Sequence, residues 1–188
     1  MALMARRTKT TRWLDAEEEA AWRAIAFLMH RLTWALECQL ERDADLSYME
    51  YHTLVRLSEE PNHTLRMSEL AMVSNQSLSR LSHLVKRLET RGLLRRETDT
   101  SDGRFTNAIL TEEGHALLVA SAPGHVEHVR ALVIDAFSAA ELRQLREASE
   151  RILARIDGRQ TGAAAATKSD DASDQAGAAR RSVHERSP

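Results

Sequence analysis

Apolar residues recur every three or four positions along most of the chain, which is the spacing of one face of an α-helix. In residues 15–42 the successive apolar positions are 3, 4, 3 and 4 residues apart, and this stripe consists of Trp22, Ile25, Met29, Leu32 and Leu36. Similar patterns predict helices in "YMEYHTLVRLSEE", "SELAMVS" and "LSRLSHLVKRLETR", and two long helices after residue 111. The chain is therefore expected to be mainly helical.

Polar residues mark the expected starts of these helices. Asp15 and Ser47 are each followed by a glutamate three positions later, a spacing typical of a helix N-terminus. Ser77 precedes the long helix of the central region, Thr111 precedes the next helix, and Ser138 again has a glutamate three positions on. In each case the side-chain oxygen can accept a hydrogen bond from a backbone N–H of the first turn.

Two features change the pattern in the C-terminal half. We expect Pro123 to kink or restart the helix that follows Thr111, with Ser121 able to cap it again. From about Gly158 onward the chain has almost no large apolar residue, so we predict that residues 158–188 form a disordered tail.

The stretch "RRETDTSDGRF" does not follow the helical pattern. Two short runs, residues 93–98 and 105–111, flank a polar tip with the turn signal Asp102-Gly103, and together they predict a β-hairpin. Asp102 also lies two residues before Arg104 and can hold its guanidinium by a charge-assisted hydrogen bond.

The composition fits one domain with a tail. Of 188 residues, 43% are apolar and 29% are charged, which is enough for one core. The sequence contains neither an apolar run of about 18 residues nor the apolar core of a signal peptide, so we expect a cytoplasmic protein without membrane contact. The single Cys38 excludes an intrachain disulfide framework and cannot form a zinc site alone.

Charge is segregated along the chain although the formal net charge is only -2. Residues 74–104 hold seven basic side chains against four acidic ones, whereas acidic residues gather in "LDAEEEA" near the N-terminus. Such segregation can direct a polyanion to one face of a protein.

The central region has the order of a helix-turn-helix: a short helix, a tight link and a second helix that opens with Ser77 and Ser79. The leucines of the second helix share one face, so its polar side chains point outward, where they can reach phosphates and base edges in a major groove. The hairpin can act as a wing that lays Arg104 against the neighbouring minor groove. The candidate DNA-contacting residues are Ser77, Ser79, Arg80, Ser82, His83, Lys86 and Arg87 on the helix, and Asp102 and Arg104 in the hairpin.

The stretch "SELAMVSNQSLSRLSHLVKRLETRGLLRRETDTSDGRFTNAILTEEGHALL" resembles the DNA-binding core of MarR-type winged-helix transcription regulators. That family has a recognition helix rich in Ser and Thr, then "RLExxGLxxR", "DxR" in the wing and "LTxxG" after it. The matching residues here are Arg87-Leu88-Glu89, Gly92-Leu93, Arg96, Asp102, Arg104, Leu110-Thr111 and Gly114.

The resemblance implies a winged helix-turn-helix fold, mainly α with a small two- or three-stranded β wing and long N- and C-terminal dimerisation helices. We place an N-terminal arm at residues 1–14, the dimerisation helices at 15–45 and 112–157, and the DNA-binding domain at 46–111. The resemblance also implies a homodimer on palindromic double-stranded DNA, and often a small effector bound where the two parts meet. The expected function is regulation of transcription, with repression favoured over activation.

The flanking helices support a dimer independently. Both carry large apolar residues that so small a central core cannot cover completely, and a partner subunit is the simplest cover for them. These residues are Trp22, Trp34, Leu132, Ile134 and Phe137, although packing within one chain stays open for each of them.

Candidate effector-binding residues lie at the N-terminus and on the first two helices, where the family usually holds small phenolic or aromatic carboxylate effectors. Arginine and histidine suit an anion, and tryptophan or tyrosine suits a ring. The candidates are Trp13, Trp22, His30, Tyr48, His52 and Arg56, and packing in the core or in an interface explains most of them equally well.

Two alternatives concern the same fold. Cys38 would make the protein a redox-responsive regulator, but the peroxide-sensing family members place their cysteine earlier, near the position of Arg23, and an inert thiol is the simpler interpretation. The winged fold would alternatively serve as a protein-interaction module without DNA binding, in which case Arg80 and Arg104 are dispensable.

Metal binding and catalysis are the remaining classes of function to consider. His125 and His128 lie three positions apart, but no convincing ligand set accompanies them, so surface histidines are the favoured interpretation. An enzyme with a Ser/His pair would need a recognisable motif, and we find no nucleophile elbow, phosphate loop, metalloprotease helix or Cys/His signature. We therefore expect no catalytic residues, metal or cofactor.

Overall fold

The computed structural model describes residues 11–158 of the chain. Most of the expected N-terminal arm and nearly all of the expected tail, residues 1–10 and 159–188, lie outside this range. The chain divides after Leu132 into two compact units, which are described separately.

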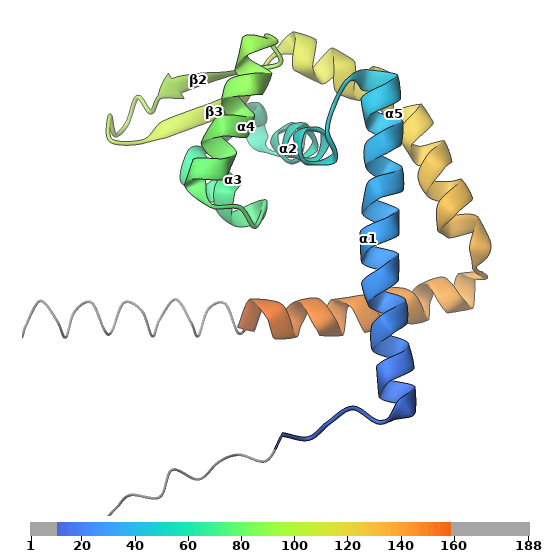
Figure 1. Cartoon of the computed structure of the whole chain (residues 1–188). Coiled ribbons are helices and arrows are strands. Elements are labelled where there is room, and N and C mark those ends of the chain that lie inside the picture. The colour runs from blue at the N-terminus through green and yellow to red at the C-terminus, as the bar shows by residue number, and fades with distance from the viewer. Residues whose placement is uncertain (1–10, 159–188) are drawn as a thin grey trace, which may run out of the picture. The chain divides into compact units, whose positions relative to one another are not determined.

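The first unit contains five helices and a small sheet among its described residues (Figure 1). In chain order these elements are α1 (Ala16–Ala44), α2 (Tyr48–Ser58), the 3-10 turn η1 (Pro61–His63), β1 (Thr64–Arg66), α3 (Met67–Val73), α4 (Leu78–Thr90), β2 (Leu94–Thr98), β3 (Thr106–Leu110) and α5 (Glu112–Leu132). The second unit contains the 3-10 turn η2 (Ile134–Ala136) and a helix over residues 139–158. That helix includes Gly158, where we expected the tail to begin.

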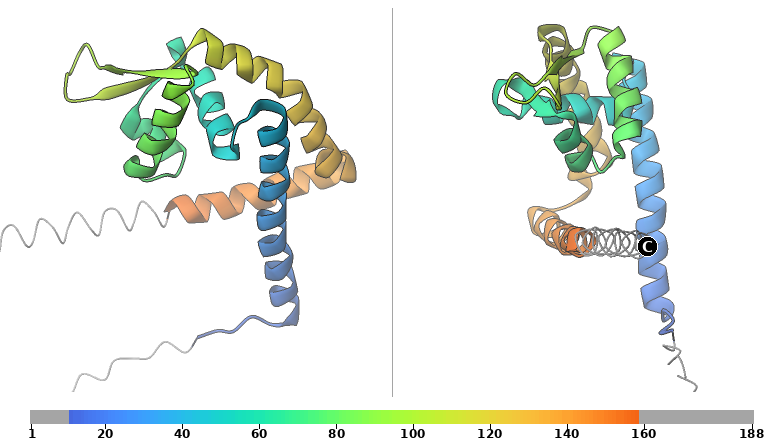
Figure 2. Two further views of the ribbon diagram at one scale, coloured as in Figure 1. Left: turned by 45° about the horizontal axis from the view of Figure 1, so that its top comes forward. Right: turned by 90° about the vertical axis from the view of Figure 1, so that its left-hand side faces the viewer.

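The sheet is antiparallel with strand order β1-β3-β2. Strands β2 and β3 form the predicted hairpin, in which Arg96 lies opposite Ala108, and this hairpin projects away from the helices (Figure 2). Strand β1 pairs Leu65 with Ala108 on the other side of β3. Strand β1 could not be predicted from the sequence, because three residues are too few to show an alternating pattern.

The predicted helix starts are confirmed. Asp15 and Ser47 each accept a hydrogen bond at the third helical residue and form complete capping boxes. Ser77 Oγ accepts from the Arg80 N–H at 3.3 Å, and Thr111 Oγ1 accepts from the Gly114 N–H at 3.0 Å. These contacts satisfy N–H groups that have no partner within the helix itself.

Of the two outcomes expected at Pro123, a kink or a restart of the helix, the restart is wrong. Helix α5 continues from Glu112 through Pro123 to Leu132, and its ribbon is bent along its length in Figure 1. Ser121 does not cap a new helix; instead its hydroxyl donates to the carbonyl of Leu117 at 2.6 Å. A proline within a helix removes one backbone hydrogen bond, and a long helix packed on a core can accept that loss as a bend.

The core of the first unit is built mainly from leucines of α2, α4 and the hairpin. Leu54, Leu81, Leu88 and Leu94 are each at most 1% exposed. Helix α1 contributes Leu40 and packs against α2 and α5. The apolar face predicted for α4 therefore lies at the centre, whereas in the predicted stripe of α1 only Leu36 is buried and Trp22, Ile25 and Met29 are exposed.

Gly114 fixes how closely α5 approaches the start of the hairpin. Here the Thr111 N–H donates to the carbonyl oxygen of Leu93 at 3.3 Å, and the Thr111 hydroxyl donates to that of Gly92 at 2.7 Å. A Cβ atom at position 114 would collide with the same Leu93 carbonyl. The glycine of the "LTxxG" motif is therefore required by backbone packing.

We predict that Gly114→Ala destabilises the protein by at least about 1–3 kcal/mol, because a backbone shift is needed to relieve the collision. Gly124→Ala is the matched control on the same helix, since its Cβ would meet only side-chain atoms at 3.8 and 3.9 Å. The control should be neutral or stabilising by up to about 1 kcal/mol. Urea unfolding of both variants measures the difference, and equal stability of the two would contradict this account.

Candidate nucleic-acid interface

Helix α4 presents one buried face and one polar face. Leu81, Leu84, Val85 and Leu88 are at most 4% exposed and pack into the core. This packing fixes the rotation of the helix about its axis, so the polar residues between the leucines must face outward. Among the predicted DNA-contacting residues of the helix, the exposed ones are Ser77, Ser79, Arg80, His83, Lys86 and Arg87, and Ser82 is half-buried.

Ser77 and Arg87 have structural partners as well. The Ser77 hydroxyl caps α4, and Arg87 Nε donates to Glu50 Oε1 on α2 at 3.0 Å. The Glu50 side chain is only 8% exposed. Burial raises the pKa of Glu50, but hydrogen bonds from Ser47 and Arg87 outweigh it and leave the pKa below its usual value. Arg87 therefore ties α4 to α2, and Arg80 and Lys86 are the better candidates for DNA contact.

Three further arginines of the basic region also have partners. Arg91 donates to the backbone carbonyl of Asp45 and so caps the end of α1. Arg95 is paired with Glu97, and Arg96 Nη2 lies 2.6 Å from Glu89. The positive charge inferred from the sequence is thus partly neutralised within the fold.

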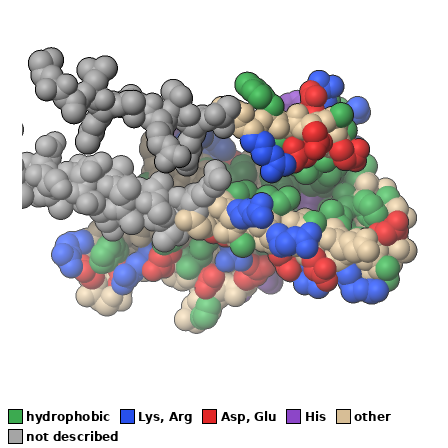
Figure 3. Space-filling view, turned by 90° about the horizontal axis from the view of Figure 1, so that it is seen from below, with side chains coloured by type: hydrophobic (Ala, Val, Ile, Leu, Met, Phe, Trp, Pro, Cys, Tyr) green, Lys and Arg blue, Asp and Glu red, His purple; other side chains and the backbone are tan. Residues whose placement is uncertain are grey.

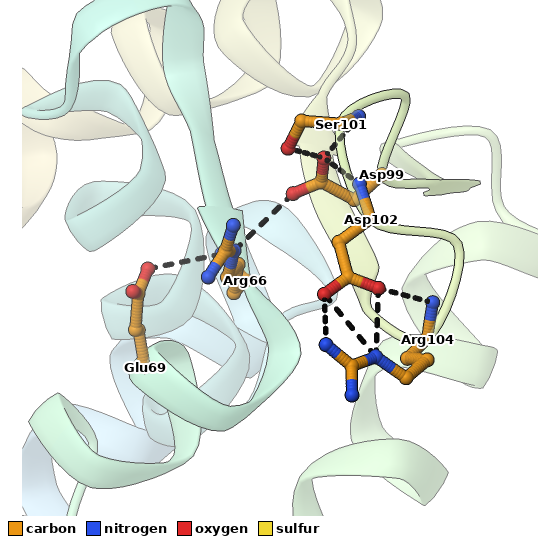
Figure 4. A network of polar contacts seen from close by, with 6 residues as sticks. All are labelled: Arg66, Glu69, Asp99, Ser101, Asp102 and Arg104. Atoms are coloured by element: carbon orange, nitrogen blue, oxygen red, sulfur yellow. Dashed lines mark hydrogen bonds and ion pairs between the residues drawn. The ribbon is translucent and has the colours of Figure 1, made fainter.

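The wing presents Arg104 in a fixed orientation. Its Nη2 and Nε donate to the two carboxylate oxygens of Asp102 at 2.6 and 2.9 Å, as Figure 4 shows. This hydrogen bonding lowers the pKa of Asp102 and raises that of Arg104, so both groups stay charged at neutral pH. The Arg104 side chain is 84% exposed. The wing therefore offers one oriented cation to a partner.

The six candidate effector residues do not form a single site within one chain. Tyr48, His52 and Arg56 line one crevice of about 230 Å³ between α2 and the end of α3. Trp13 and Trp22 line a different hollow at the start of α1. The sixth residue, His30, lines a third hollow farther along α1 with Met29 and Trp34.

The crevice contains polar atoms that have no partner among the described residues. Arg56 Nε and Ser74 Oγ are buried and make no hydrogen bond there. Burial lowers the pKa of His52, which favours its neutral form at pH 7. The side chains of Met49 and Val73 form an apolar wall of the crevice. A donor set beside an apolar wall suits a small molecule with an acceptor or anionic group. The sequence did not point to Ser74, because a lone serine after a helix has no distinguishing pattern.

Of the three histidines on α5, His115 is exposed, whereas His125 and His128 are half-buried and not at the surface as we expected. His125 Nδ1 lies 3.0 Å from Gln39 Oε1, and the His125 ring packs at a tilt against the Tyr51 ring, with the ring centroids 4.6 Å apart. Within residues 11–158, no group of three or more His, Cys, Asp or Glu side chains is arranged to hold a metal ion.

Cys38 is a half-buried free thiol. No helix within residues 11–158 is long and apolar enough to cross a membrane.

Comparison with known proteins agrees with this architecture. The model of the MarR family matches residues 46–106. Transcriptional repressor MprA of Escherichia coli K12 is 29% identical over 107 residues, which are 57% of this chain and 60% of that repressor. The chain therefore matches less than two thirds of the length of this curated relative.

Two solved structures from Streptomyces coelicolor are similar over most of their length. AbsC, a MarR family transcriptional regulator, has a TM-score of 0.75 and 40% identity, over 79% of this chain and 99% of AbsC. Sco3205, a regulator of the same family crystallised in complex with DNA, has a TM-score of 0.74 and 43% identity, over 76% of this chain and 89% of Sco3205. The chain has a winged-helix fold and belongs to the MarR family of transcriptional regulators.

Proposed function

We propose that this protein is a sequence-specific DNA-binding repressor that acts as a homodimer on a palindromic operator. The observation that carries the proposal is that the chain has both an exposed polar face on α4 and an exposed, oriented arginine in the wing, Arg104. Arg80 and His83 can meet base edges or phosphates in a major groove, while Arg104 reaches the adjacent minor groove. The DNA complex of Sco3205 supports the same mode of action here.

The homodimer is supported by large apolar side chains that are exposed within residues 11–158. On α1, Trp22 is 55% exposed, Phe27 69% and Trp34 66%. Hydrophobic side chains also lie at the surface among charged ones on the face drawn in Figure 3. Monomeric soluble proteins rarely expose apolar residues on this scale. A two-fold dimer would cover them and set two copies of α4 about one turn of DNA, ~34 Å, apart.

A small aromatic or anionic effector is proposed for the crevice lined by Tyr48, His52 and Arg56. The Nη atoms of Arg56 already pair with Glu59 and Glu60, which leaves the Arg56 Nε–H and the Ser74 hydroxyl to donate to a carboxylate, and the ring of Tyr48 can pack on an aromatic body. The crevice adjoins α3, the first helix of the helix-turn-helix. The dimer can adopt a geometry in which its two recognition helices no longer match the spacing of the half-sites. An effector that binds this geometry more tightly would release the operator.

We predict that Arg80→Ala and Arg104→Ala each weaken operator binding about tenfold, the loss typical of a direct nucleic-acid contact. Changes at Ser79 or His83 should alter sequence preference. Arg146→Ala is the control, because Arg146 pairs with Glu150 on the last helix. Fluorescence anisotropy with a fragment selected from genomic DNA measures all variants. Unchanged binding by both test variants would instead favour a protein-interaction module.

For the dimer, we predict that Trp34→Glu lowers the mass in solution from two chains to one, because a carboxylate would be buried in an apolar interface. Met72→Glu is the control: Met72 is 74% exposed but lies on α3, outside the proposed interface. Removal of residues after Gly158 should leave the dimer intact. Light scattering gives the masses, and a monomeric wild-type chain would refute this part of the proposal.

For the effector, we predict that Ser74→Ala abolishes or weakens the binding of an aromatic carboxylate without loss of folding stability. The Ser74 hydroxyl has no partner in the described chain, so its removal costs no hydrogen bond in the free protein. Calorimetric titration of a panel of aromatic acids measures binding to both forms. If no member of the panel binds the wild type, or if Ser74→Ala binds equally well, this crevice is not the effector site.

A further inference from the structure

Arg66 occupies a position that local helix energetics do not favour. It is the N-cap residue of α3, where an oxygen-bearing side chain normally accepts a hydrogen bond from the first turn. A guanidinium has no acceptor, and a cation is unfavourable at a helix N-terminus. The remaining cap contact is the Arg66 backbone N–H, which donates to Glu69 Oε2 at 3.4 Å. A residue that violates a local preference in this way commonly serves another contact.

That other contact is with both ends of the wing loop, the residues 99–105 that join β2 to β3. Arg66 Nε donates to Asp99 Oδ2 at 3.2 Å, and Asp99 directly follows β2. The Arg66 guanidinium carbon also lies 4.5 Å from the ring centroid of Phe105, which directly precedes β3. One planar cation therefore holds the two ends of the wing loop from the side of β1 and α3, and Figure 4 shows its contact with Asp99.

Asp99 passes this restraint on to the tip of the wing. Its Oδ1 accepts hydrogen bonds from the hydroxyl of Ser101 at 2.6 Å, from the N–H of Ser101 at 2.8 Å and from the N–H of Asp102 at 3.3 Å. The Ser101 hydroxyl, the two backbone N–H groups and Arg66 hold the pKa of Asp99 well below its usual range. The same loop then orients Arg104 through Asp102. Arg66 is thus connected to Arg104 through Asp99 and the loop backbone.

We propose that Arg66 is a positioning residue that fixes the wing against α3, so that Arg104 meets the minor groove at a set distance from the recognition helix. This inference rests on the proposed DNA binding. It differs from a direct contact between Arg66 and a phosphate, because the Arg66 side chain is only 37% exposed and is already engaged by Asp99 and Phe105.

The test variant is Arg66→Thr, which removes the guanidinium and supplies the missing N-cap oxygen. We expect operator binding to fall about tenfold while thermal stability is retained, because α3 gains a cap. Arg66→Lys should recover part of the binding, since it keeps the charge opposite Asp99 but loses the flat face over Phe105. Arg95→Thr, on strand β2 of the same sheet, also removes one positive charge, and its loss of operator binding should be smaller.

A double-mutant cycle with Arg104→Ala separates positioning from direct contact. If Arg66 acts through the wing, Arg66→Thr should cost less than about twofold once Arg104 is absent. An equal loss in both backgrounds, or a loss no larger than that of Arg95→Thr, would overturn the proposal. So would an Arg66→Thr protein that binds as tightly as wild type.

A second measurement needs no DNA. The Asp99 N–H donates to the Phe105 carbonyl at 2.9 Å across the base of the wing loop. We expect its hydrogen exchange to be faster in Arg66→Thr and unchanged in Arg95→Thr. Unchanged exchange in Arg66→Thr would overturn the positioning role even if operator binding is lost. If the wild type binds no DNA, the proposed function fails, and the exchange rates still decide whether Arg66 holds the wing.

Discussion

Burial of the leucine face of α4 is the constraint on which the rest of this structure depends. Leu81 and Leu88 are fully buried against leucines of α2 and the hairpin, so the helix cannot rotate without exposing them. Moving one such leucine into water costs about 1.5–3 kcal/mol. The outward direction of Arg80 and His83 therefore follows from the core. A rigid core that orients a polar face is what a sequence-reading helix requires.

The wing depends on a different kind of restraint. Its polar loop has little apolar surface to bury, so its geometry is set by hydrogen bonds that the Asp99 carboxylate accepts and by the stacking of Arg66 on Phe105. Arg104 is exposed but oriented, whereas Arg87 is exposed yet tied to the buried Glu50. Exposure alone thus does not separate residues available to DNA from those that hold the fold together.

The features that the sequence predicted well are local. Capping at Asp15, Ser47 and Ser77 depends on contacts three residues apart, and the leucine stripe of α4 depends on a repeat within one helix. Two features that the sequence missed depend on pairs of residues far apart. Strand β1 pairs with β3 more than 40 residues later, and Arg66 pairs with Asp99 33 residues later. A single sequence contains no signal that joins such distant positions.

Operator recognition is the central claim, and a footprint on genomic DNA tests it most directly. The full chain, unfolded and refolded to remove bound small molecules, is allowed to select among genomic fragments, and the tightest fragment is footprinted across a salt series. The account predicts a protected palindrome whose half-sites lie about one helical turn apart, with affinity that falls steeply as salt rises. Binding without a selected fragment, or without salt dependence, would contradict it.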